Sequence, residues 1–107
     1  MDVVTKWPGV SVVVPVYQSV YTLPNLVERV NSTLAALGEY EILLVDDGSA
    51  DCTWTAVSDL SERWPQVTGV RLGRNFGQHN ALVAGLRAAS MPVTVTIDDD
   101  LQNPPEE

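Results

Sequence analysis

The chain has 107 residues, which suits one small domain and leaves no room for two. Hydrophobic residues make up 45 % of the sequence, an ordinary share for a globular protein with a core. The 14 acidic and 6 basic residues give a net charge of −8 at pH 7. This balance argues against a nucleic-acid-binding protein, because phosphate backbones are bound through Lys and Arg.

The single cysteine, Cys52, excludes an intrachain disulfide and a cysteine-based zinc site. No run approaches the roughly 18 apolar residues of a membrane-spanning helix, and the N-terminus does not have the pattern of a signal peptide. We therefore expect a reducing, cytoplasmic setting. Residues 1–9 are short and polar, and we interpret them as a lead-in to one domain over residues 10–107.

The first half of the chain predicts two strands, each followed by a helix. Residues 10–16 form a β-branched apolar run of strand length, with Pro15 near its end. Apolar residues at helical spacing predict a helix over 23–37. A second buried strand is predicted over 41–46, followed by a helix over 52–64.

The second half repeats this alternation. A strand is predicted over 67–72, a loop over 73–77, a helix over 78–89 and a last strand over 93–97. The order β-α-β-α-β-α-β predicts an α/β fold, with a mostly parallel sheet covered by helices on both faces.

Polar residues follow each of the four predicted strands. Right-handed crossovers place the carboxyl ends of parallel strands at one edge of the sheet, where open α/β folds bind ligands. We therefore expect one site to be built there from four separate loops: Tyr17 and Gln18, Asp46 and Asp47, Arg74 and Asn75, and Asp98 to Gln102.

The acidic run after the last strand contains an Asp-X-Asp spacing. Alternate residues of an extended segment point the same way, so Asp98 and Asp100 can face one ligand while Asp99 faces elsewhere. Hard oxygen ligands select Mg2+ or Mn2+, which commonly bridge to substrate phosphates. A solvated acidic tail is the alternative, but an apolar strand leads directly into this run.

Two further segments have both structural and functional interpretations. Asp46-Asp47-Gly48-Ser49 is either a turn with a local hydrogen bond or a carboxylate that binds a nucleobase or ribose. Arg74 precedes a predicted helix start, where an arginine and the helix dipole both favour a phosphate; the alternative is an exposed loop arginine. His79 is interpreted as a polar residue at the helix start rather than a catalytic base.

Four segments in this order resemble inverting glycosyltransferases of family 2, which have the three-layer, Rossmann-like GT-A fold. The matching segments are residues 12–17, 44–49, 74–79 and 98–107. The closing residues 101–107 look most like the branch that transfers sugars to polyprenyl phosphates. Undecaprenyl-phosphate aminoarabinose and glucosyl transferases and dolichyl-phosphate mannose synthases belong to that branch. Asp99 departs from this branch, where a small residue is usual.

The resemblance implies a nucleotide-sugar site, with a UDP-linked sugar as the expected donor. Pro15, Tyr17 and Asp47 would lie along the nucleoside, with Asp46 close by. Arg74 would lie beside the nucleotide, near its phosphates.

The resemblance also implies a metal centre. Asp98 would contact the ribose or the metal, and Asp100 and Gln102 would hold Mg2+ or Mn2+ together with the diphosphate. Asp98 and Asp100 are thereby the implied catalytic residues. The cation would stabilise the leaving nucleotide while the acceptor, a polyprenyl phosphate or another acceptor, attacks the opposite side of the sugar and inverts its configuration.

In the resembled family, acceptor-side residues and membrane-associating segments follow the Asp-X-Asp region. We therefore expect residues 10–107 to be the donor-binding part of a truncated glycosyltransferase domain, weakly active or inactive alone, whose exposed sheet edge favours self-association. For the full-length protein we expect the cytoplasmic face of the membrane. The alternative function is a non-catalytic nucleotide- or metal-binding module. A dinucleotide oxidoreductase is disfavoured because no Gly-x-Gly-x-x-Gly follows the first strand.

Overall fold

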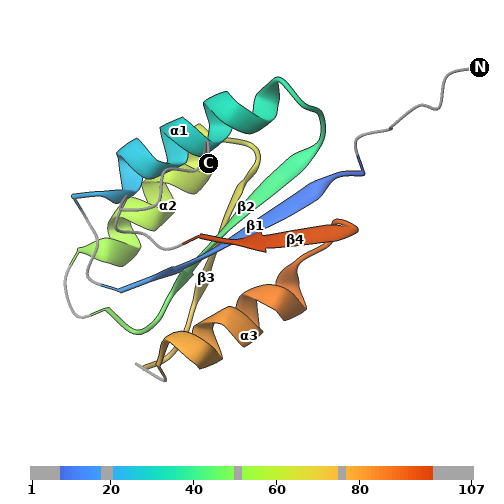
Figure 1. The fold of residues 1–107 in the computed structure, drawn as a ribbon. Coiled ribbons are helices and arrows are strands. Elements are labelled where there is room, and N and C mark those ends of the chain that lie inside the picture. Colours follow the sequence, from blue (N-terminus) through green and yellow to red (C-terminus); the bar gives the residue numbers. More distant parts are fainter. Residues whose placement is uncertain (1–7, 18–20, 50–51, 75–76, 98–107) are drawn as a thin grey trace, which may run out of the picture.

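The computed structural model describes residues 8–17, 21–49, 52–74 and 77–97. Within these ranges, four parallel strands form one sheet in the order β3-β2-β1-β4 (Figure 1). Their bounds are β1 Val10–Val16, β2 Tyr40–Asp46, β3 Val67–Arg71 and β4 Val93–Thr96. Each strand lies within one or two residues of its predicted position.

In the described part of the chain, three helices cover the sheet. Figure 1 shows α1 (Leu23–Ala35) and α2 (Thr53–Arg63) on one face and α3 (Gln78–Ala88) on the other. The predicted α/β fold class, with a parallel sheet between two helical layers, is confirmed. The described helices include none that is long and apolar enough to span a bilayer.

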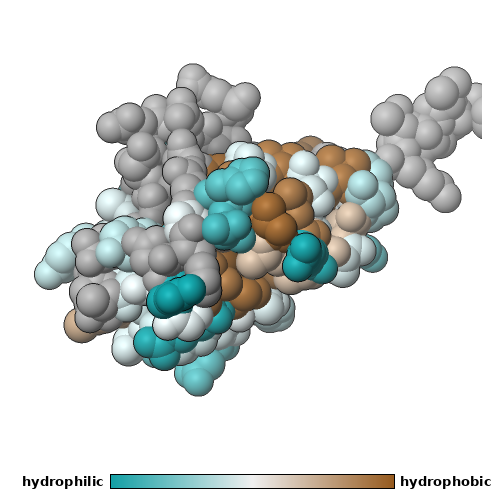
Figure 2. All heavy atoms as spheres, turned by 90° about the horizontal axis from the view of Figure 1, so that it is seen from below, coloured by the Kyte–Doolittle hydropathy of each residue, from teal (hydrophilic) through white to brown (hydrophobic). Residues whose placement is uncertain are grey.

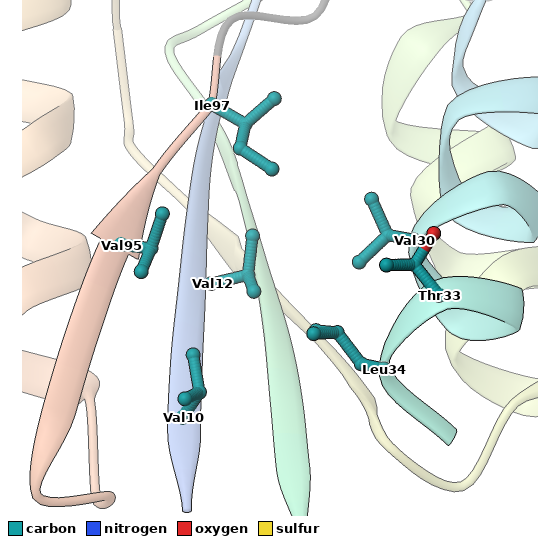
Figure 3. Close-up of a pocket in the computed structure, with 7 residues that line it drawn as sticks. All are labelled: Val10, Val12, Val30, Thr33, Leu34, Val95 and Ile97. Carbon is teal, nitrogen blue, oxygen red and sulfur yellow. The ribbon is translucent and has the colours of Figure 1, made fainter. Parts of the chain in front are cut away.

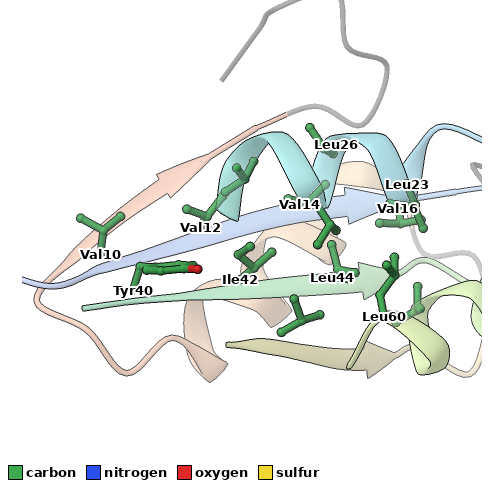
Figure 4. Close-up of a cluster of buried hydrophobic side chains, with 14 residues drawn as sticks. Val10, Val12, Val14, Val16, Leu23, Leu26, Tyr40, Ile42, Leu44 and Leu60 are labelled. Atoms are coloured by element: carbon green, nitrogen blue, oxygen red, sulfur yellow. The ribbon is translucent and has the colours of Figure 1, made fainter. Parts of the chain in front are cut away.

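The strand side chains divide between the two faces with the expected period of two. The larger cluster joins Val12, Val14, Ile42 and Leu44 of the central strands to the buried side of α1 and α2 (Figure 4). The smaller cluster joins Val13, Leu43 and Val45 to Ala81 of α3. Since both faces of β1 and β2 are buried, these two strands read in the sequence as continuous apolar runs rather than as alternating ones.

α3 approaches the sheet closely because one of its residues has no side chain. A Cβ atom built on Gly85 would lie 2.3 Å from Val13 Cγ1 and 3.2 Å from Val45 Cγ2. Seen from the α3 side, hydrophobic residues group together on the surface between hydrophilic ones (Figure 2). Leu86 of α3 is one of the exposed large hydrophobic residues of the described chain, as are Val93 and Val95 of β4.

A polar cluster joins three segments at the amino-terminal end of the sheet. Glu41 of β2 accepts hydrogen bonds at Oε2 from Ser11 Oγ of β1, from Ser90 N at 2.7 Å and from Ser90 Oγ at 2.9 Å. Ser11 Oγ in turn accepts one from Met91 N at 3.1 Å. Burial raises the pKa of Glu41, but the three hydrogen bonds together outweigh burial and hold the pKa below its ordinary value. This cluster fixes the segment that leads into β4.

The strand order places a topological switch at β1. The chain passes from β1 to β2 and β3 on one side, then returns to form β4 on the other side of β1. Near the carboxyl-terminal end of β1, its pairing with β4 stops early. The last hydrogen bond runs from Ile97 N to Val13 O, because the next donor position on β1 is Pro15, which has no N–H. Such switch points are where open α/β sheets bind ligands.

Candidate functional site

Two adjacent aspartates, Asp46 and Asp47, lie at the centre of the sheet edge at which the strands have their carboxyl-terminal ends. Their backbone connects the ends of three strands: Asp47 N donates to Val16 O of β1 at 2.8 Å, and Asp46 O accepts from Leu72 N after β3 at 2.9 Å. The three strands β1, β2 and β3 therefore end level with one another. This is the arrangement that the sequence predicted for the loops after these strands.

Asp46 is completely buried. Its Oδ1 accepts a hydrogen bond from Ser49 N at 3.0 Å, the local turn that was one of the two interpretations of this segment. Its Oδ2 is also buried and has no hydrogen-bond partner within the described ranges of the chain. A buried carboxylate oxygen in this state is costly, which distinguishes Asp46 from an ordinary turn aspartate.

Asp47 is 4 % exposed and connects β2 to the start of α3. Its Oδ2 accepts a hydrogen bond from Gly77 N, 30 residues further along the chain, at 3.1 Å. Gly77 is the N-cap residue of α3 and has a φ of 98°, a backbone conformation that favours glycine. The carboxylate thus lies at the helix N-terminus, where the helix dipole stabilises a negative charge.

Tyr17 and Arg74 lie on the two loops that Asp47 holds together. Tyr17 directly follows β1 and is 45 % exposed. Arg74 is exposed on the segment between β3 and α3, three residues before Gly77. The described residues of the predicted nucleotide site therefore lie at the same sheet edge: Pro15, Tyr17, Asp46, Asp47 and Arg74. What each of them binds stays a prediction.

A hollow of about 340 Å3 opens beside the turn that follows the two carboxylates in the chain, and the sequence did not indicate it. Gly48 and Ser49 line it from the β2 side, and Arg71, Leu72 and Gly73 line it from the β3 side. The Arg71 guanidinium stacks over Trp54 of α2, 5.3 Å from the ring centre. The sequence signal was an arginine at the last position of an otherwise uncharged strand.

The predicted metal ligands Asp98, Asp100 and Gln102 lie outside the described residues, as does Gln18. The part of the chain that is described contains no group of three or more acidic, His or Cys side chains that could hold a metal ion. The described chain ends at Ile97, whose N–H is bonded to β1. His79 is exposed in the first turn of α3, in line with the interpretation of a polar helix-start residue.

Residues 11–107 match the sequence profile of the family described as Glycosyl transferase family 2. The chain is 49 % identical over 100 residues to an undecaprenyl-phosphate 4-deoxy-4-formamido-L-arabinose transferase from Enterobacter sp. (strain 638). It is 46 % identical over 100 residues to the transferase of the same description from Klebsiella pneumoniae. Each alignment covers 92 % of this chain and 31 % of the relative, so the chain spans about a third of the length of these relatives.

Solved glycosyltransferase structures share the fold. The mannosyltransferase PcManGT from Pyrobaculum calidifontis, in complex with GDP-Man and Mn2+, superposes with a TM-score of 0.78 at 27 % identity and covers 85 % of this chain and 27 % of its own. Residues 1–349 of S. aureus TarS, in complex with UDP-GlcNAc, superpose with a TM-score of 0.71 at 25 % identity over 85 % of this chain and 26 % of that one.

Proposed function

The chain belongs to glycosyl transferase family 2, and on that premise we propose that it forms the donor-binding part of an enzyme that transfers a sugar from a nucleotide diphosphate to a polyprenyl phosphate. The observation that carries this proposal is the position of Asp46 and Asp47. This dipeptide bonds to the ends of β1 and β3 and to the start of α3, and so gathers the predicted nucleotide-binding loops at the switch point of the sheet.

The donor is proposed to be a UDP-linked sugar. Tyr17 offers an exposed aromatic ring at the end of β1, and Arg74 offers a cation before the N-terminus of α3. A ring and a guanidinium on adjoining loops suit a nucleoside and its phosphates. One structural neighbour binds UDP-GlcNAc and another binds GDP-Man, so both bases belong in the test.

Asp98, Asp100 and Gln102 are proposed to hold a divalent cation with the diphosphate of the donor. Support comes from β4, which runs parallel to β1 and delivers the chain at Ile97 to the same edge as Asp46 and Asp47. The neighbour in complex with GDP-Man also contains Mn2+. When bound, Mg2+ or Mn2+ would supply positive charge to the departing nucleotide.

The proposed acceptor is a polyprenyl phosphate, as in the names of the two bacterial relatives. A phosphate acceptor is already ionised at neutral pH, so attack on the anomeric carbon needs no strong general base, and attack from the side opposite the nucleotide inverts the configuration. In a longer protein the reaction would take place at the cytoplasmic face of a membrane, where the lipid acceptor lies.

The second candidate function is a non-catalytic module that binds a nucleotide and a metal. The described residues support it as well, because the Asp46–Asp47 edge that carries the donor proposal would bind a nucleotide with or without turnover. A donor-hydrolysis assay separates the two: release of free sugar that requires Asp100 supports the enzyme, and nucleotide binding without release supports the module.

The test of the donor site is calorimetric titration of the 107-residue chain with UDP and with GDP, each with and without Mn2+. We expect UDP to bind more tightly with Mn2+ present and Asp47→Asn to weaken binding at least tenfold. Asp59→Asn, which removes the same charge from an exposed position on α2, is the matched control and should bind as the parent does. A folded chain that binds neither nucleotide at millimolar concentration refutes the donor site.

A further inference from the structure

A tryptophan and an arginine pack together on the face of β3 that α2 covers. Gly69 and Arg71 are two residues apart on this strand, so they face the same side of the sheet. A Cβ atom built on Gly69 would lie 2.7 Å from Val57 Cγ1 and 3.2 Å from Trp54 Cη2, so the missing side chain lets α2 approach the strand closely. The Arg71 guanidinium lies over the Trp54 ring, 5.3 Å from its centre. Gly69, Trp54 and Arg71 therefore form one packed unit.

Stacking orients the Arg71 side chain without using its hydrogen-bond donors. A guanidinium contacts an aromatic ring with its flat face, whereas its N–H groups lie in the plane of the group and stay available at its edge. Within the described ranges, Arg71 forms no ion pair with a carboxylate. Its donors are therefore available to an anion from outside the chain.

Arg71 lines the hollow of about 340 Å3 that opens at the carboxyl-terminal ends of β2 and β3. This volume is within the range of small-molecule sites. Arg71 provides the only charged side chain of its described lining, and two of the other lining residues are glycines, Gly48 and Gly73. A Cβ atom built on Gly73 would meet no atom within 4 Å. Since neither glycine has a side chain, their backbone can come close to a ligand.

A second hollow has the opposite chemistry. It has a volume of about 190 Å3 and lies between the sheet and α1 (Figure 3). Its described lining is hydrophobic apart from Thr33 and contains no charged side chain. An anion would lose its hydration there without gaining a charged partner. Of these two hollows, the one beside Arg71 is therefore the one suited to an anion.

Arg71 and the Asp47 carboxylate lie on opposite faces of the sheet. Arg71 is paired in register with Asp46, and both side chains belong to the α2 face. Asp47 is the next residue and bonds to Gly77 at the start of α3, on the other face. α2 also begins at this edge and has no acidic residue in its first turn, so the positive end of its dipole adds to the charge of Arg71. The positive charge on the α2 face is therefore separate from the predicted nucleotide site.

We propose that Arg71 and this hollow bind a phosphate group other than the diphosphate of the donor. Two N–H groups of the guanidinium would pair with two phosphate oxygens, and the uncovered backbone at Gly48 and Gly73 leaves room for the other oxygens. A held guanidinium is needed because the net charge of −8 otherwise opposes the approach of an anion. The phosphate belongs either to a soluble phosphorylated molecule or to a lipid headgroup. Phosphate binding at Arg71 requires neither a nucleotide nor a metal ion in the predicted donor site.

The first test is a titration of the isotope-labelled 107-residue chain with sodium phosphate, followed by NMR at constant ionic strength. We expect the amide signals of Gly48, Ser49 and Gly73 to shift together and to saturate at millimolar phosphate. Arg71→Gln should weaken this binding at least tenfold, because it removes the charge and the paired donors.

Arg63→Gln is the matched control, because it removes the same charge from an exposed position in the last turn of α2, at the other end of that helix. It should bind phosphate as the parent does, and melting curves establish that both variants are folded. If the three amide signals do not shift in a saturable way, or if Arg63→Gln loses as much binding as Arg71→Gln, phosphate binding at Arg71 is refuted.

Substitutions at residue 73 separate charge from space. Gly73→Asp adds a carboxylate to the lining that Arg71 shares, at a position where a Cβ has room. This carboxylate should compete with phosphate and weaken its binding at least tenfold. Gly73→Asn adds a side chain of the same size without the charge and should retain most of the binding. Trp54→Leu keeps the charge of Arg71 but removes the ring that orients it, so we expect an intermediate loss. Equal binding by the two residue-73 variants would overturn the proposal.

Two further titrations identify the source of the phosphate and separate this site from the donor site. Phosphatidylcholine vesicles that contain phosphatidic acid should retain the parent but not Arg71→Gln if the phosphate is a lipid headgroup, and should retain neither if it is soluble. UDP with Mn2+ should bind Arg71→Gln as tightly as the parent, and Asp47→Asn should still bind phosphate. A loss of UDP binding in Arg71→Gln as large as its loss of phosphate binding would make the hollow part of the donor site and overturn the proposal. If the chain binds no nucleotide, the phosphate titration still decides the role of Arg71.

Discussion

The Asp47 carboxylate is expected to stabilise the fold and to shape the nucleotide site at the same time. It is 4 % exposed, and it accepts the Gly77 N–H at 3.1 Å at the start of α3. Asp47→Ala removes the Asp47 acceptor of that partly buried N–H and a negative charge from the helix N-terminus. A charge-assisted bond of this kind contributes about 2 kcal/mol to the free energy of unfolding. For a chain of this size the midpoint of thermal unfolding should fall by about 10 °C.

Asp47→Asn separates the charge from the hydrogen bond. Its amide oxygen can still accept the Gly77 N–H, so about 1 kcal/mol should be lost, which corresponds to about 5 °C. The order parent, Asp47→Asn, Asp47→Ala should therefore appear in thermal unfolding followed by circular dichroism. Asp59→Asn on the exposed face of α2 controls for the change in net charge. The reasoning is refuted if Asp47→Ala melts within 2 °C of the parent, because the bond to Gly77 would then carry no stability.

Two further predictions concern the packing of α3 and the polar cluster at the opposite end of the sheet. Gly85→Ala improves the helix propensity of α3 by about 1 kcal/mol. It also places a Cβ 2.3 Å from Val13 Cγ1. We therefore expect the free energy of unfolding, measured by chemical denaturation, to fall by about 2 kcal/mol net. Adding Val13→Ala should recover part of that loss, and purely additive effects would contradict the contact. Glu41→Gln weakens the hydrogen bonds that the carboxylate accepts, so the free energy of unfolding at pH 7 should fall, and the melting temperature with it. Because the cluster is partly exposed, we expect this loss to be only about 1 kcal/mol. The pKa of Glu41 is lowered by folding, so its contribution is present above the ordinary value of 4.5 and is lost as the pH falls through the folded-state pKa. A melting difference that persists unchanged at pH 2 would contradict this assignment.

The elements of the fold could be predicted from the sequence because each depends on local periodicity. The helix predicted over 23–37 is observed over Leu23–Ala35, and Gly38, with a φ of 145°, follows it as a left-handed stop. The remaining differences are of one or two residues at element ends, where helices fray and the assignment is least sharp.

Contacts between distant segments could not be predicted in the same way. The hydrogen bond from Gly77 to Asp47 spans 30 residues, and the one from Ser90 to Glu41 spans 49. No local pattern specifies which loop lies beside which carboxylate until the strand order is known, and alternation alone fixes parallel strands without fixing their order. The hollow beside Arg71 was missed for this reason: its two sides come from the ends of different strands.

The strand period explains why two adjacent aspartates have different partners. Even-numbered residues of β2, such as Ile42 and Leu44, point toward α1 and α2, and odd-numbered ones, such as Leu43 and Val45, point toward α3. Asp46 continues the even series and bonds to Ser49 on the way to α2, whereas Asp47 continues the odd series and bonds to Gly77 at the start of α3. One dipeptide therefore anchors the loops on both faces of the sheet. Exchange of either carboxylate for an apolar residue should release the loop on its own side only, and hydrogen exchange at the Ser49 and Gly77 amides would report each release separately.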